Sequence, residues 1–86
     1  MRRQGTIAMI DPEQSAAAIA TEGRGYTVVE VDPDWPAEVG DVIEWDADED
    51  SLGFQEYQNV SKGAAGDVFV QNHDVDEATL RRQFGF

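Results

Sequence analysis

The sequence predicts an all-β fold, a small five-stranded barrel followed by a short C-terminal helix. Three observations support this prediction. The chain has 86 residues, which is enough for one small domain over residues 1–86 and no more. Short segments rich in apolar and β-branched residues recur along it. Turns rich in glycine or proline separate these segments, an arrangement typical of small barrels.

The first strand is predicted over residues 5–11, which are mostly apolar or β-branched. Residues 12–20 allow two interpretations. Asp11 before Pro12, followed by an acidic residue and three alanines, is typical of a helix start, and the helix would be short. The alternative is a turn, a strand over residues 16–21 and a glycine-rich hairpin turn. We favour this hairpin.

Further strands are expected between the next turns. Residues 32–36 form a rigid loop, because each proline fixes its own φ and restricts the residue before it. Residues 46–53 form an acidic loop. These further strands are predicted over residues 26–31, 42–45, 54–60 and 67–71. The first five strands make a barrel at about residues 5–60, and the strand at 67–71 is an addition to it.

A helix is predicted at the C-terminal end, over about residues 76–84. Asp76 can cap its first turn, and Val75 and Leu80 occupy the two positions of a hydrophobic staple. Two arginines follow near the end of this helix, where the macrodipole favours cations.

Charge is the strongest compositional feature. The chain has 18 acidic and 6 basic residues, a net charge of −12, and no basic residue between Arg24 and Lys62. Such a negative field repels nucleic acid phosphates and anionic membranes and favours cationic partners. Acidic, lysine-poor surfaces also keep proteins soluble in strong salt, so a halophilic cell is an alternative explanation of the charge.

Few residues offer catalytic or metal chemistry. Cysteine is absent, which excludes disulfides and cysteine-based zinc sites. His73 is the only histidine, and we expect an ordinary turn residue there. The apolar N-terminal run breaks at Asp11, too early for an export signal or a membrane span. We therefore expect a cytoplasmic protein without enzymatic activity, cofactor or membrane contact.

The acidic loop opens like a calcium-binding loop. Its weak candidate ligands are Asp46, Asp48 and Asp50. The sixth position should be glycine and is Ser51, and the twelfth should be glutamate and is Tyr57. We therefore favour a solvated acidic loop over a metal site.

Six segments carry a family resemblance. They are GTIAMID (5–11), EQS (13–15), AAAI (16–19), YTVVEVD (26–32), VGDVIE (39–44) and QNV (58–60). Together they resemble the cold-shock domain over about residues 5–60. The resemblance implies an OB-like barrel, with an SH3-like barrel as the main alternative. Residues 51–72 also resemble small uncharacterised bacterial proteins, which implies no function.

The resemblance fails where the family binds single-stranded nucleic acid. Family members stack bases on exposed rings above a cationic surface. The matching positions here are Met9, Ala16, Ala18, Val28 and Glu30, and the family's lysines align with Ala8 and Gln14. Nucleic acid binding is therefore disfavoured. We expect a binding or interaction module with a protein partner, and the negative charge favours a cationic one. The alternatives are a degenerate single-strand binder and a structural domain acidic only for solubility.

The candidate binding face comprises Met9, Ala16, Ala18, Val28, Glu30 and Trp35. An aliphatic patch on a soluble domain usually marks a protein contact. The alternative is that residues 75–86 fold back and cover the patch with Leu80 and Phe84. Trp35, between two prolines, is either a core residue or an exposed anchor. The other large aromatic residues are expected mostly in the core: Trp45, Phe54, Tyr57 and Phe69.

Overall fold

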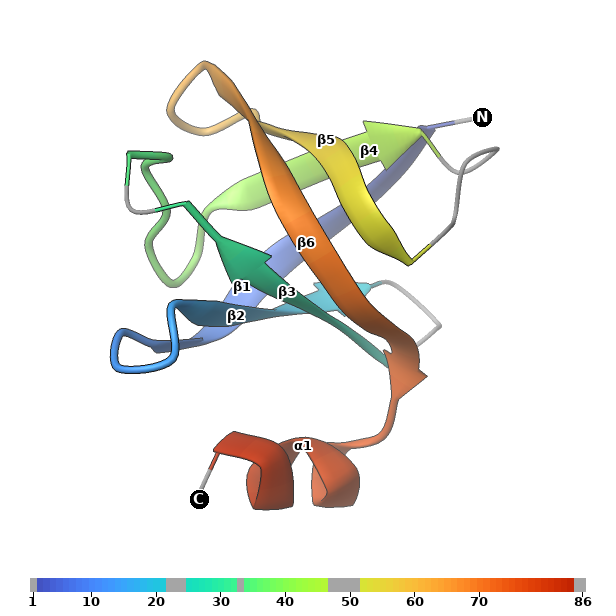
Figure 1. The fold of residues 1–86 in the computed structure, drawn as a ribbon. Helices are drawn as coiled ribbons and strands as arrows, with labels where there is room; N and C mark the ends of the chain where they lie inside the picture. Colours follow the sequence, from blue (N-terminus) through green and yellow to red (C-terminus); the bar gives the residue numbers. More distant parts are fainter. Residues whose placement is uncertain (1, 22–24, 33, 47–51, 85–86) are drawn as a thin grey trace.

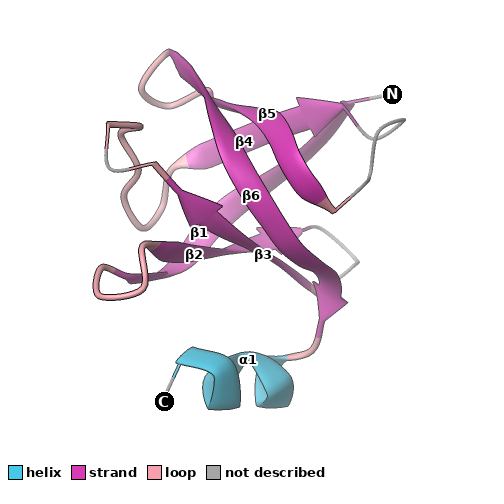
Figure 2. Ribbon diagram, viewed as in Figure 1, coloured by secondary structure: helices cyan, strands magenta, loops and turns pink. Residues whose placement is uncertain are grey.

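The part of the chain that the structure describes forms six strands and one helix (Figures 1 and 2). The computed structural model describes residues 2–21, 25–32, 34–46 and 52–84. The elements in chain order are β1 (Arg2–Asp11), β2 (Ala16–Thr21), β3 (Tyr26–Val31), β4 (Val42–Asp46), β5 (Gly53–Asn59), β6 (Ala64–Val75) and α1 (Glu77–Phe84). An all-β barrel with a short C-terminal helix is confirmed, with six strands in place of five.

The barrel closes in the order β1-β2-β3-β6-β5-β4, and all neighbouring strands are antiparallel. Two three-stranded meanders, β1–β3 and β4–β6, therefore face each other. The strand that we expected at residues 67–71, as an addition to the barrel, is longer than predicted. β6 has 12 residues and pairs with both β3 and β5, so it is a wall of the barrel.

Residues 16–21 form a strand, so the hairpin interpretation is confirmed and the helix interpretation is wrong. The Asp11 carboxylate caps the turn before this strand by accepting hydrogen bonds from the backbone N–H groups of Glu13 and Gln14, at 3.0 and 3.4 Å. The alanines of β2 suit a strand with close neighbours on both faces, because Ala17 points into the barrel and Ala18 points outward.

A β-bulge at Ala8 decides which side chains of β1 enter the barrel. Ile7 pairs with Ile19 and Met9 pairs with the next residue of β2, Ala18, so one residue of β1 has no counterpart. Ile7 therefore points inward and Met9 outward, although a regular strand would place both on one face.

Because of the bulge, β1 contributes side chains to two separate apolar clusters. The inner cluster fills the barrel and contains Ile7, Ala17, Ile19, Val29, Trp35, Ile43, Trp45, Tyr57, Val68 and Val70. The outer cluster lies between the sheet and α1 and contains Ala16, Ala18, Val28, Val75 and Leu80, with Met9 and Tyr26 packed against it. The wall made by β2 and β3 is thus covered on both faces.

The N-terminus of α1 is stabilised by the two interactions predicted from the sequence, a side-chain cap and a hydrophobic staple. Asp76 accepts a hydrogen bond from the backbone N–H of Thr79 at 2.7 Å, and Val75 and Leu80 are both buried in the outer cluster. This confirms the N-terminal cap and the hydrophobic staple. Arg81 forms an ion pair with Glu77 one turn earlier, at 2.8 Å. With eight residues in α1, no helix in the described part of the chain could cross a membrane.

Candidate functional site

The predicted binding face exists, but α1 covers most of it. Met9, Ala18 and Val28 lie side by side on the outer surface of three neighbouring strands, as predicted. Ala18 and Val28 are 0% exposed, because Leu80 packs over them. The structure therefore supports the covering alternative, and the free-face interpretation is wrong for these residues. Ala16 is buried with them, and the side chain of Phe84 lies outside the described residues.

Trp35 is not an exposed anchor. It is 6% exposed, and its indole Nε1–H donates a hydrogen bond to the Ala64 carbonyl at 3.2 Å. The ring lies so close to Gly66 that a Cβ there would be 2.8 Å from the Trp35 Cδ1. The proline-rich loop thus turns the indole onto one end of the barrel, where it closes the inner core.

The predicted turn at His73 is also wrong. His73 lies in β6, and its Nδ1 is hydrogen-bonded to the Thr27 hydroxyl at 3.0 Å. That hydroxyl is 3.3 Å from the hydroxyl of Thr21, so the three side chains form a polar chain between β2, β3 and β6. Because β6 extends to Val75, its end carries residues that the sequence analysis assigned to a turn.

The weak metal candidates are not assembled in the described part of the chain. Asp46 ends β4 with an exposed side chain, while Asp48 and Asp50 lie outside the described residues. Among the residues that the structure describes, no three side chains of the metal-binding types come together.

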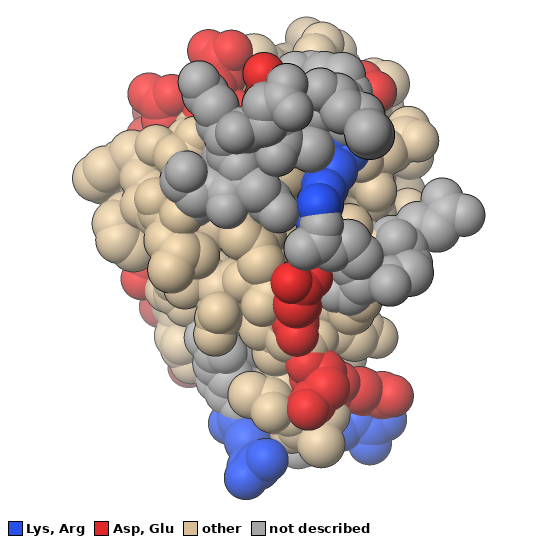
Figure 3. Space-filling model, turned by 90° about the vertical axis from the view of Figure 1, so that its right-hand side faces the viewer, with Lys and Arg blue, Asp and Glu red and all other residues tan. Residues whose placement is uncertain are grey.

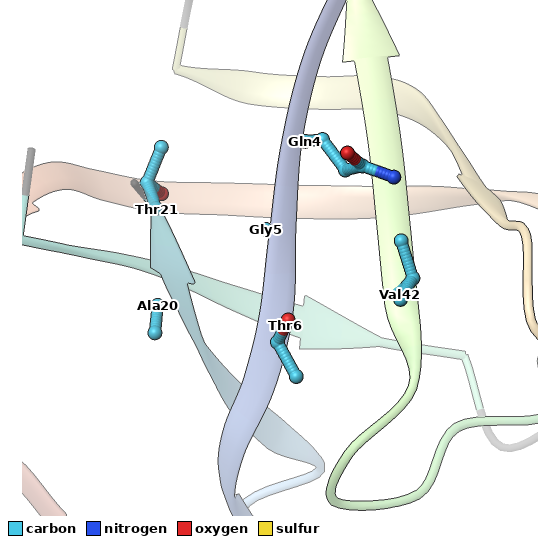
Figure 4. A pocket seen from close by; sticks show the side chains of 6 residues that line it. All are labelled: Gln4, Gly5, Thr6, Ala20, Thr21 and Val42. Carbon is cyan, nitrogen blue, oxygen red and sulfur yellow. The ribbon is translucent and has the colours of Figure 1, made fainter. Parts of the chain in front are cut away.

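A depression lies over Gly5, where β1 is flanked by β2 and β4 (Figure 4). Its volume is about 380 Å³, and it is lined by Gln4, Gly5, Thr6, Ala20, Thr21 and Val42. Gly5 is required there, because a Cβ would lie 2.5 Å from Ile19 Cγ2 and 2.8 Å from the Ala20 carbonyl oxygen. The described lining of the depression supplies hydroxyl and amide groups from Thr6, Thr21 and Gln4.

Asp41 is a buried carboxylate with a structural role. The Asn59 amide donates to it at 2.9 Å, and the Glu38 backbone N–H donates at 3.0 Å. The Asn59 hydrogen bond holds the pKa of Asp41 below its usual value, with help from the Glu38 N–H and the ammonium of Lys62. Asn59 also donates to the Pro36 carbonyl at 2.8 Å, so this group ties the loop before β4 to the end of β5.

Two phenylalanines that we expected in the core lie on the surface. Phe54 of β5 is 78% exposed and Phe69 of β6 is 38% exposed. Residues three apart on a strand point to opposite faces, so Phe54 and Tyr57 cannot both point inward. Tyr57 takes the core position, and Phe54 is left outside. This odd spacing is the sequence signal that identifies an exposed ring here. Trp45 and Tyr57 are buried, as predicted.

The exposed rings form a pair bordered by carboxylates. Their centroids are 5.1 Å apart and their planes meet at 82°, a favourable edge-to-face arrangement. Phe69 lies next to Glu30 in the sheet register. A groove of about 400 Å³ follows the pair and is lined by Glu30, Val31, Asp32, Phe54, Asp67 and Phe69. We call this the Phe54–Phe69 groove. It contains Glu30, the one residue of the predicted binding face that stays exposed beside a pocket.

The described basic side chains lie elsewhere. Lys62 contacts Glu38 and Asp41, at 3.6 and 3.5 Å, and Arg81 contacts Glu77. On the face drawn in Figure 3, basic side chains gather mainly at the lower end, at the level of α1, below a broad uncharged area. Within the described ranges, no lysine or arginine forms an ion pair with a carboxylate of the groove. The groove thus combines two accessible rings with carboxylates that form no ion pair with a described basic side chain.

Comparisons of the chain with protein-family models, with curated proteins and with solved structures gave no match. The groove is therefore assessed on its own geometry and charge.

Proposed function

We propose that the protein is a non-enzymatic interaction module that binds a basic segment of a partner protein in the Phe54–Phe69 groove. The observation that carries this proposal is the exposed edge-to-face ring pair beside Glu30 and Asp67. An arginine side chain suits such a site, because its guanidinium can lie on a ring face while it donates hydrogen bonds to a carboxylate.

The distribution of apolar surface supports the same conclusion. The outer apolar cluster is covered by α1, whereas the two phenylalanines are covered by no described element. Large exposed rings that border charged residues are typical of protein contacts. A cytoplasmic location and a cold-shock-like ancestry remain part of this proposal, as does a halophilic origin for the acidic residues outside the groove.

Single-stranded nucleic acid is the second candidate partner, because exposed rings on a sheet can stack bases for about 1–3 kcal/mol each. The groove carboxylates oppose it, since they would lie close to the phosphates and the net charge is −12. We therefore favour a basic protein segment.

The test compares fluorescein-labelled peptides of mixed basic, neutral and acidic sequence, and labelled oligo-dT, by fluorescence anisotropy. We expect only the basic peptides to bind. The Phe54→Ala/Phe69→Ala variant should weaken that binding by about ten-fold, because two cation–π contacts of modest strength are lost. Val39→Ala is the matched control, since Val39 is 62% exposed and lies outside the groove.

Equal binding of basic and neutral peptides, or unchanged binding by the double variant, would contradict the proposal. Oligo-dT binding tighter than about 100 μM at moderate salt, which is the weak end of the non-specific range, would favour the nucleic acid alternative.

A further inference from the structure

The outer surface of β3, β6 and β5 carries its side chains in rows that run across the strands. β6 lies between the other two strands in the barrel (Figure 1). Phe69 of β6 is paired with Glu30 of β3 on one side and with Phe54 of β5 on the other. We call these three residues the aromatic row. All three line the Phe54–Phe69 groove, so the row forms one wall of it.

A second row, two residues earlier in β6, consists of carboxylates. Asp67 is paired with Glu56 of β5. The pairing of β3 with β6 reaches Val31 and Val68, and one more step in the same register brings Asp32 beside Asp67. We call Asp32, Asp67 and Glu56 the acidic row, and all three residues are exposed. Residues two apart on a strand are about 7 Å apart, so this is the distance between the rows. Asp32 and Asp67 form the second wall of the groove.

The acidic row is unfavourable in the unbound protein. Like charges directly opposite each other on neighbouring strands destabilise a sheet, and Asp67 has a carboxylate on each side. Among the described basic side chains, none forms an ion pair with a carboxylate of this row. A cation supplied by a partner would therefore reduce the repulsion at Asp67 without any change of fold.

The distance between the two walls fits a guanidinium group. A planar group packs about 3.5–4 Å from an aromatic ring, and a charged N–H group donates to a carboxylate at about 2.7–2.9 Å. These two contacts together span about 6–7 Å, close to the spacing of Phe69 and Asp67 along β6. An arginine can therefore contact both walls at once. A lysine ammonium is a compact, strongly hydrated charge without a planar face, so it lacks this combination.

We infer that the Phe54–Phe69 groove selects arginine over lysine, and that Asp67 determines this selectivity. The inference rests on the proposed function and names the side chain that the groove recognises. The guanidinium lies between the two walls, with its planar surface on the ring pair and its N–H groups directed to Asp67. Its positive charge offsets the repulsion within the acidic row, so recognition and relief of repulsion occur at the same residue.

The experiment uses three fluorescein-labelled peptides of one sequence, which carry arginine, lysine or citrulline at the same positions. Citrulline keeps the planar shape of arginine but has no charge. By fluorescence anisotropy, the arginine peptide should bind the full chain about five-fold or more tighter than the lysine peptide, and the citrulline peptide should bind least. Asp67→Asn and Phe69→Leu should each bring the ratio of arginine to lysine affinity close to one, because each removes the contact with one wall.

Thermal unfolding of the unbound variants separates recognition from a structural role of Asp67. Asp67→Asn should raise the thermal midpoint in dilute buffer, because it removes like-charge repulsion, although it weakens arginine binding. Glu13→Gln is the matched control. It removes the same charge from an exposed residue in the turn between β1 and β2, outside the described lining of the groove. It should leave the ratio of arginine to lysine affinity unchanged and raise the midpoint less.

Four results would overturn the inference. Equal binding of the arginine and lysine peptides, with both lost in Phe54→Ala/Phe69→Ala, would keep the groove as the site and exclude selection of arginine. An arginine preference that persists in Asp67→Asn would exclude Asp67 as its determinant. A lower midpoint in Asp67→Asn than in Glu13→Gln would give Asp67 a structural role instead. Failure of both cationic peptides to bind would refute the proposed function and this inference with it.

Discussion

Leu80 provides the most direct test of how the apolar outer face is stabilised. Its side chain is 0% exposed and packs, with Val75, over Ala18 and Val28. In Leu80→Ala the helix keeps its cap at Asp76 and its helix propensity, while most of the buried side chain is lost. The perturbation therefore isolates the packing of α1 on the barrel.

The magnitude follows from the burial of Leu80. Leucine-to-alanine changes at buried sites cost about 2–5 kcal/mol, depending on how far the site can collapse. Since α1 is one outer layer and can settle toward the sheet, we expect about 2–3 kcal/mol. A chain of 86 residues is stabilised by about 4–13 kcal/mol in total, so this is a large fraction. With a urea m-value of about 1–3 kcal/mol/M, the unfolding midpoint should fall by about 0.7–3 M.

Urea unfolding followed by circular dichroism measures this midpoint. Ala78→Gln is the matched control, because Ala78 is exposed on the same helix and both residues favour helices. Deletion of residues 76–86 should expose the outer cluster and cause aggregation or a larger loss of stability. If Leu80→Ala lowers the midpoint no more than Ala78→Gln does, α1 does not stabilise the barrel and the covered-face interpretation is refuted.

Three other outcomes are expected. Asp41 has a lowered pKa in the folded state, so its interactions stabilise the protein above the ordinary pKa of 3.8 and are lost as pH falls through the folded pKa. The difference in thermal midpoint between wild type and Asp41→Asn should therefore shrink with acidification. A difference that stays constant with pH would count against this role of Asp41. The thermal midpoint should rise substantially from dilute buffer to molar KCl, because salt screens a net charge of −12; a flat profile would argue against halophilic adaptation. Gly66→Ala should destabilise the protein by about 1–3 kcal/mol and alter tryptophan fluorescence, because the new Cβ would lie 2.8 Å from Trp35 Cδ1; normal stability and fluorescence would show that the indole can move.

Local patterns predicted much of the fold. The β-branched run at Tyr26–Val31 and the cap and staple around Asp76 are signals that depend on neighbouring residues only, and both were correct. The match of individual positions to the cold-shock pattern predicted that Met9, Ala18 and Val28 share one outer surface, and they do. These features need no knowledge of distant contacts.

The site could not be predicted in the same way. Alternation divides a strand into two faces but does not say which face is buried. In β5 the buried face carries Tyr57 and Asn59, and burial of Asn59 is favourable only because Pro36 and Asp41 supply acceptors from a distant loop. Because the face of β5 that carries Tyr57 and Asn59 is buried, Phe54 on the opposite face is exposed. The stack of Trp45 on Tyr57 likewise joins residues 12 positions apart, so no local pattern predicts it.

The bulge at Ala8 has a consequence for how the chain tolerates the loss of residues. Deletion of a residue within a strand usually reverses the faces of all residues on one side of it. Deletion of Ala8 would instead restore regular alternation, with Ile7 still opposite Ile19 and Met9 still opposite Ala18. This deletion would remove the local bend and twist that a bulge adds to a strand. A deletion scan of β1 should therefore find one tolerated position, Ala8, whereas removal of Thr6 would turn Gly5 outward and abolish the close approach of β1 to β2.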